Sequence, residues 1–188
     1  MKTIIFKSSI LFFIVALSMI SYNGYSQKSR LTRQEQKEKM NADLITNFKV
    51  LDTLLEMKRF VFEANYTYGS YGERNVKSWT NFIKVDSCKV VIQPTSVPFS
   101  LNYIGIKDIS NAEGSIQDWK LIKDEKALRY KLSFSTSSII ENFDITMRIT
   151  AENLVTATIT GSLTGTRTYL GNIQTIYNSA IYQYPARY

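Results

Sequence analysis

The feature that most constrains the fold is a two-residue alternation of apolar and polar side chains between residues 128 and 173. From Phe143 to Thr150 every odd-numbered residue is apolar and every even-numbered residue is polar, and residues 128–134 and 155–160 repeat this alternation. Successive side chains of a β-strand point to opposite faces, so the pattern predicts strands with one buried face and one solvent-facing face. Such strands are typical of an antiparallel sheet, because parallel sheets are usually buried on both faces.

The start of the chain has the organisation of a secretory signal peptide. Two lysines precede an apolar run over residues 10–20, and the small residues Gly24 and Ser26 lie before the expected cleavage site, between Ser26 and Gln27. The run has about half of the ~20 residues that a membrane-spanning helix needs, and the sequence has no cysteine near the junction for lipid attachment. We therefore expect residues 1–26 to be removed on export to the periplasm or the exterior, leaving one α+β domain over residues 27–188 and no stable membrane span.

Composition argues against several classes of function. The formal net charge is +7, and it falls to +5 when the two lysines of the leader are removed. The most basic stretch, residues 28–39, contains two glutamates and fits a solvated helix face better than a nucleic-acid site. Histidine is absent, which removes the commonest general base and the commonest zinc ligand. We expect no nucleic-acid partner, no metal and no cofactor. The single cysteine, Cys88, permits no internal disulfide and is interpreted as a small buried hydrophobe.

The remaining pattern predicts one helix followed by strands. Residues 31–57 carry a helical apolar stripe, and Thr32 and Glu35 have the spacing of a capping box. Short alternating segments, bounded by glycine, proline, serine and asparagine, follow from residue 60 onward, and residues 67–72, rich in tyrosine, glycine and serine, are expected to form a surface loop. The fold class is therefore α+β: an N-terminal helix packed on a curved, mostly antiparallel sheet of about eight strands. A closed β-barrel with the helix is the alternative arrangement.

Three short motifs carry a resemblance to a known family. They are Arg59-Phe60-Val61-Phe62-Glu63-Ala64 after the helix, Leu101-Asn102-Tyr103-Ile104-Gly105 in the middle, and Tyr169-Leu170-Gly171-Asn172-Ile173 near the end. In this order, after a signal peptide, they resemble a domain-of-unknown-function family, number four-two-five-one in that series, of small exported Bacteroidetes proteins. The resemblance covers roughly residues 51–173 and implies an exported, sheet-rich fold. It implies no activity and no catalytic residues.

For function, the residues favour binding over catalysis. The acidic residues that could serve a glycosidase are not paired by any spacing in the sequence; they are Glu63, Asp86, Asp108, Asp118 and Asp144. Aromatic residues are frequent, and exposed aromatic surface often marks an interaction site. We therefore expect a non-enzymatic envelope protein that binds an apolar ligand or a protein partner; the alternatives are a structural or assembly component and, less favoured, a carboxylate-dependent hydrolase. The candidate contact residues are Tyr66, Tyr68, Trp79, Tyr103 and Tyr169.

Overall fold

The computed structural model describes residues 32–69, 72–93, 112–139 and 141–181. The chain divides into two compact units at Met40. In the described part, the first unit holds only residues 32–40, where helix α2 (Arg33–Glu56) begins. A capping box starts this helix: the backbone N–H of Glu35 donates to the Thr32 hydroxyl, and the N–H of Thr32 donates to the Glu35 carboxylate at 2.7 Å. The capping box confirms the predicted start of the helix.

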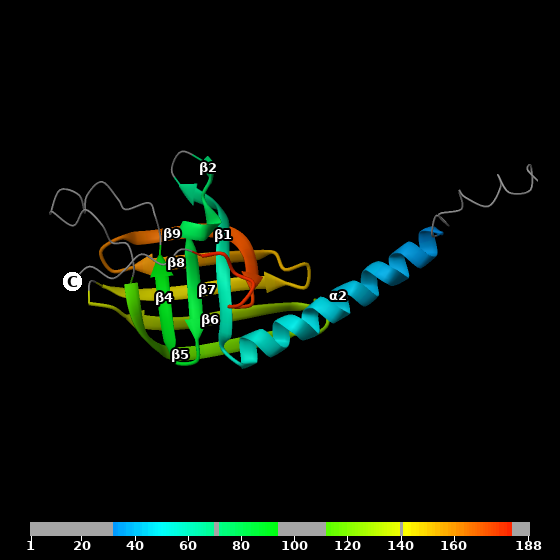
Figure 1. The fold of residues 1–188 in the computed structure, drawn as a ribbon, viewed down its shortest axis with the longest axis horizontal. Helices are drawn as coiled ribbons and strands as arrows, with labels where there is room; N and C mark the ends of the chain where they lie inside the picture. Colours follow the sequence, from blue (N-terminus) through cyan, green and yellow to red (C-terminus); the bar gives the residue numbers. More distant parts are fainter. Residues whose placement is uncertain (1–31, 70–71, 94–111, 140, 182–188) are drawn as a thin grey trace, which may run out of the picture. The chain divides into compact units, whose positions relative to one another are not determined.

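The second unit is built on a nine-stranded antiparallel sheet (Figure 1). A short 3₁₀ helix, η1 (Ser78–Thr80), lies between its second and third strands. In chain order the strands are β1 (Arg59–Gly69), β2 (Gly72–Asn75), β3 (Phe82–Asp86), β4 (Lys89–Gln93), β5 (Ala112–Asp124), β6 (Arg129–Ser137), β7 (Asn142–Thr150), β8 (Val155–Gly161) and β9 (Gly165–Gln174). In the sheet they lie in the order β2-β1-β3-β4-β5-β6-β7-β8-β9.

The sheet closes on itself because β1 also pairs with β9. β1 binds β3 and β2 along one edge and β9 along the other, so β2 lies outside the closed ring of eight strands. A bulge between Ala64 and Tyr66 shifts the register at this seam. Gly171 is required there, since a Cβ on it would lie 1.9 Å from the Glu63 carbonyl oxygen. The α+β class is confirmed, and the sheet takes the closed arrangement rather than an open curved one.

The closed sheet buries the alternating apolar residues as predicted. Phe143, Ile145, Met147 and Ile149 on β7 are at most 2% exposed, whereas the polar residues between them reach solvent. The helix adds three buried side chains to the same core: Phe48, Leu51 and Leu55. The predicted helical stripe therefore packs against the sheet from the second half of α2 onward.

Two local predictions were wrong. Residues 67–72 were expected to form a loop, but β1 runs to Gly69 and pairs with β2 in a hairpin. Cys88 was interpreted as buried, but it is exposed in the turn between β3 and β4. A turn places its side chains outside the pleat of the sheet, so an apolar cysteine there meets solvent.

Candidate functional site

The structure separates the aromatic residues that the sequence suggested as contacts. Tyr66, Tyr68 and Trp79 are exposed, at 41%, 44% and 46% of their surface. Tyr169 is buried on β9, with 2% of its surface exposed. Tyr103 lies outside the described residues. Three of the five candidates are therefore accessible to a partner, and Tyr169 could touch only a ligand inside the sheet.

Tyr66 and Tyr68 lie on one face of β1, two residues apart. They are paired across the seam with Leu170 and Thr168 of β9. The pKa of the Tyr68 hydroxyl is raised by its partial desolvation and by the nearby Glu73 carboxylate, so this hydroxyl stays neutral at physiological pH. The pair presents two phenol rings on the outer face of the sheet.

Tyr169 borders a small internal cavity of about 10 Å³. Its hydroxyl finds no hydrogen-bond partner among the described residues. A cavity of this size holds about one water molecule. This cavity is therefore far too small for an apolar ligand, and Tyr169 acts as a core residue here.

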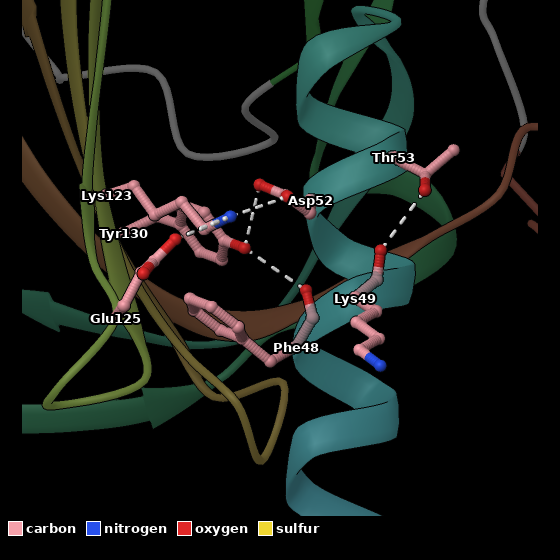
Figure 2. Close-up of polar contacts among 7 residues, drawn as sticks. All are labelled: Phe48, Lys49, Asp52, Thr53, Lys123, Glu125 and Tyr130. Carbon is pink, nitrogen blue, oxygen red and sulfur yellow. Dashed lines mark hydrogen bonds and ion pairs between the residues drawn. The ribbon is translucent and has the colours of Figure 1, made fainter.

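A polar contact joins the helix to the sheet (Figure 2). The hydroxyl of Tyr130 on β6 lies 3.1 Å from the Phe48 carbonyl oxygen and 3.0 Å from Oδ1 of Asp52, and its hydrogen is shared between these acceptors. Nζ of Lys123 on β5 donates to Oδ2 of Asp52 at 2.7 Å. The rings of Phe48 and Tyr130 stack with their centroids 4.6 Å apart. We call Asp52, Lys123 and Tyr130 the helix clasp.

The electrostatics of the helix clasp are those of a structural contact. The hydrogen bond from Lys123 is the main cause that lowers the pKa of Asp52, and the same bond raises the pKa of Lys123. Burial, followed by the hydrogen bond to Asp52, raises the pKa of Tyr130 well above its ordinary value. All three groups therefore keep one charge state across the physiological range, which suits a fixed contact and does not suit acid–base catalysis.

A hollow with mixed polar and apolar lining lies elsewhere, on the outer face of β5 to β8. A groove of about 540 Å³ follows the ends of these strands. One cross-strand row of four residues forms its floor: Ile122, Lys131, Arg148 and Thr156, each in register with the next. The neighbouring cross-strand row adds Asp124, Arg129 and Thr150 to the lining of the groove. Leu154, in the β7–β8 turn, also lines the groove. We call this feature the cationic groove.

Two cations face one another in the cationic groove. Lys131 and Arg148 are direct cross-strand partners, and within the described part of the chain neither makes an ion pair or a hydrogen bond. Arg129 is different, because it binds Oδ2 of Asp124 at 3.0 Å. Like charges placed directly opposite across a sheet are destabilising. The floor of the groove therefore carries two positive charges that the described residues do not neutralise.

Apolar side chains lie on both sides of these cations. Ile122 on β5 is 46% exposed and Leu154 in the β7–β8 turn is 66% exposed. The alkyl stems of Lys131 and Arg148 add further carbon surface. The groove thus combines uncompensated positive charge with exposed hydrocarbon, a combination that suits a ligand bearing both an anionic and an apolar part.

The cationic groove was not predicted from the sequence. The residues were visible as polar members of the alternation, but their alignment depends on the register between β6 and β7. It also depends on a bulge in β5, where the register with β6 shifts between Gln117 and Lys120 and Asp118 has φ 51°. The available signal was the presence of Arg129, Lys131 and Arg148 on solvent-facing positions of adjacent predicted strands.

The carboxylates that a hydrolase would need are largely dispersed. Asp86 pairs with Arg59, and Glu63 accepts a hydrogen bond from Ser179. Asp118 and Asp144 do share the outer face, where Ser135 lies between them as the donor to Asp118 and the cross-strand partner of Asp144. Neither lines the cationic groove or the cavity beside Tyr169, and Asp108 lies outside the described residues.

The described residues were also considered as possible metal ligands and as possible membrane-spanning helices. Among them, no three side chains of the histidine, cysteine or carboxylate type come together as a metal site. In the same part of the chain, every helix is too short or too polar to cross a bilayer.

The fold and the groove define a class of protein: an antiparallel sheet closed on itself, with an N-terminal helix packed on its core and a charged groove outside. The model of a domain of unknown function, DUF4251, matches residues 42–173, and the chain belongs to this family. This finding confirms the resemblance carried by the three motifs.

A solved structure gives the same fold. The chain is similar to the crystal structure of a DUF4251 family protein from Bacteroides eggerthii DSM 20697, with a TM-score of 0.59 and 23% sequence identity. The similarity covers 71% of this chain and 91% of that chain. The search of curated proteins found no match. The comparisons therefore establish family and fold and assign no activity.

Proposed function

We propose that the mature chain is an exported, non-enzymatic protein of the cell envelope that binds an apolar ligand or a protein partner. The observation that carries this proposal is the cationic groove. Its volume of about 540 Å³ lies in the range of small-molecule sites, which run from about 300 to 1,000 Å³. Its exposed Ile122 and Leu154 are side chains that a bound apolar group would shield from water.

A neutral, polarity-sensitive dye tests whether the groove takes an apolar group. We expect the mature protein to enhance the fluorescence of Nile red, and Leu154→Ser to weaken that enhancement. Leu163→Ser is the matched control, since Leu163 is a leucine of similar exposure, 56%, in the β8–β9 turn outside the groove. Equal fluorescence from both variants and the wild type would remove the groove as the binding site.

Export rests on the leader sequence. We expect expression of the full chain in a Gram-negative host to place the protein outside the cytoplasm with Gln27 as its first residue. A variant that lacks residues 2–26 should stay in the cytoplasm. Recovery of the full chain uncleaved in the cytoplasmic fraction would contradict export.

A protein partner is the second candidate, and a specific feature favours it. β2 is an exposed four-residue strand whose described pairing is to β1 alone, and Tyr66 and Tyr68 lie on the strand beside it. An exposed strand edge can accept another strand. Closure of the ring leaves a much shorter open edge than an open sheet would, which weakens the structural or assembly alternative. Light scattering at high protein concentration separates these possibilities: self-association would favour assembly, and a monomer would oppose it.

The non-enzymatic proposal is tested on Asp118 and Asp144, which lie on either side of Ser135 on the outer face. If the chain were a glycosidase acting through Asp118 and Asp144, a panel of chromogenic glycosides would be hydrolysed by the wild type and not by Asp144→Asn. We expect no hydrolysis by either protein. Turnover that disappears in the variant would overturn the non-enzymatic proposal.

A further inference from the structure

We propose that the occupant of the cationic groove is a free, single-chain amphiphile with one anionic head group, held by Lys131 and Arg148. This inference rests on the proposed function, because it names the chemical class of the ligand for the same groove. It follows from the charges on the floor, from their lack of partners in the described part of the chain, and from the apolar side chains beside them.

The head group is defined by the two cations. Lys131 and Arg148 occupy facing positions on β6 and β7, so their side chains rise from adjacent strands about 5 Å apart. An anion between them can accept a hydrogen bond from the ammonium and from the guanidinium at once. It also removes the repulsion between the two cations. A neutral ligand would leave that repulsion in place, so the site discriminates in favour of an anion.

The other charged residues of the groove leave its positive charge in place. Among the described residues, Asp124 is the one acidic residue that lines the groove, and it is held by Arg129 at 3.0 Å. The backbone N–H of Ala127 and then this arginine are the main causes that lower the pKa of Asp124. Asp124 is thus already paired and does not neutralise Lys131 or Arg148. The net charge available to a ligand remains positive.

The apolar part of the ligand is defined by the sides of the groove. Ile122 lies next to Lys131 in the cross-strand row. Leu154 lies in the neighbouring row, opposite Thr150, whose backbone N–H donates to the Leu154 carbonyl oxygen at 3.0 Å. From Ile122 to Thr156 the row of the two cations crosses three strand spacings, roughly 14 Å. A single hydrocarbon chain can leave the cations along this row to cover Ile122, or leave it diagonally to cover Leu154.

Binding of matched probes tests the head group. Isothermal titration of the mature protein with dodecanoate and with dodecanol, below the concentration at which dodecanoate forms micelles, compares one chain with and without a charge. We expect dodecanoate to bind about tenfold or more tightly, the effect of one hydrogen bond to a charged group. This preference should shrink as salt is raised, since salt screens exposed charges. Equal affinity for the two probes would overturn the inference.

Two double variants test whether Lys131 and Arg148 cause the preference for dodecanoate over dodecanol. Lys131→Gln/Arg148→Gln should lose the preference for dodecanoate and keep its affinity for dodecanol. The control Lys84→Gln/Lys89→Gln removes the same charge from β3 and β4, on residues that line a different surface hollow, and should keep the preference. Circular dichroism checks that both variants are folded. Loss of the preference in both double variants would show a general charge effect and reject the site.

The outcomes separate this inference from the proposed function. If Leu154→Ser weakens Nile red binding while dodecanoate and dodecanol bind equally, the groove binds apolar groups and the inference about the head group fails alone. If Leu154→Ser has no effect on Nile red, the proposed function fails at this site. Binding to phosphatidylglycerol vesicles without binding to dodecanoate would identify a bilayer surface as the occupant and would reject the free amphiphile.

Discussion

Two buried tyrosines differ in the hydrogen bonding of their hydroxyl groups, and this difference gives a quantitative prediction for stability. Tyr130 and Tyr169 are each 2% exposed. The Tyr130 hydroxyl is bonded to the Phe48 carbonyl and to Asp52, whereas the Tyr169 hydroxyl has no partner among the described residues. Replacing either by phenylalanine keeps the ring and removes only the oxygen. The two substitutions therefore measure what each hydroxyl contributes to the free energy of unfolding.

The magnitude follows from the hydrogen bonds in the structure. A hydrogen bond to a charged acceptor contributes about 1.5–3 kcal/mol. In Tyr130→Phe the Asp52 carboxylate keeps its bond to Lys123, so we expect a loss at the lower end of this range, about 1.5 kcal/mol. For a chain of this size that corresponds to a fall in Tm of about 3–6 °C. Tyr169→Phe removes an unbonded polar atom from the core, and we expect a change between zero and a gain of about 1 kcal/mol.

Thermal and urea denaturation followed by circular dichroism measure both effects on the mature protein. The m-value should stay constant, since neither substitution changes the surface exposed on unfolding. Equal losses of stability in the two variants would contradict this contrast, because the hydroxyl of Tyr169 would then be bonded as firmly as that of Tyr130. A Tyr130→Phe variant as stable as the wild type would also contradict it, because the Tyr130 hydroxyl would then contribute nothing to the fold.

Three further predictions concern charge and the closing seam. Asp52→Asn should lower stability at pH 7, and the difference should shrink as pH falls below the ordinary carboxyl pKa. The pKa of Asp52 is lowered in the folded state, mainly by Lys123, so its contribution is complete above the ordinary carboxyl pKa and is lost as pH falls through the folded value; a difference in urea denaturation that stays constant as pH falls would contradict this cause. Lys131→Gln should stabilise the fold by a few tenths of a kcal/mol, because it removes the repulsion from Arg148, and calorimetry at low salt would contradict the assignment if Tm fell. Gly171→Ala should destabilise by about 2 kcal/mol or more, because its Cβ would meet the Glu63 carbonyl oxygen; a Tm equal to that of the wild type would contradict this contact.

The fold was largely predictable because its main determinants are local in the sequence. The alternation on β7 shows which side chains are buried whatever the neighbouring strands are, and Phe48, Leu51 and Leu55 fall on one helical stripe. Closure of the sheet was not predictable in the same way. It depends on pairing β1 with β9, for which Phe62 must meet Ile173, more than a hundred residues away. Nothing in either strand alone distinguishes a closed ring from an open curve.

The functional residues were harder to predict, for a related reason. Counting aromatics selected Tyr169, which the structure buries, together with Tyr66 and Tyr68, which it exposes. An aromatic side chain suits a core and a binding surface equally well, so its identity does not reveal its place. The pairing of Lys131 with Arg148 is informative, but it exists only once the register between β6 and β7 is known.

The rest of the outer face shows why that pairing points to a ligand. Several other polar side chains on the face bond one another across the strands: the Thr160 and Thr166 hydroxyls lie 3.1 Å apart, and Ser135 donates to Asp118. Arg129, two residues from Lys131, has its own carboxylate. A sheet that arranges its neighbours in this way could as easily have placed an acidic residue opposite Lys131. Local contacts that oppose stability are expected mainly at functional sites, and the facing cations are such a contact. Their stability cost and their preference for an anion should therefore disappear together when either cation is replaced.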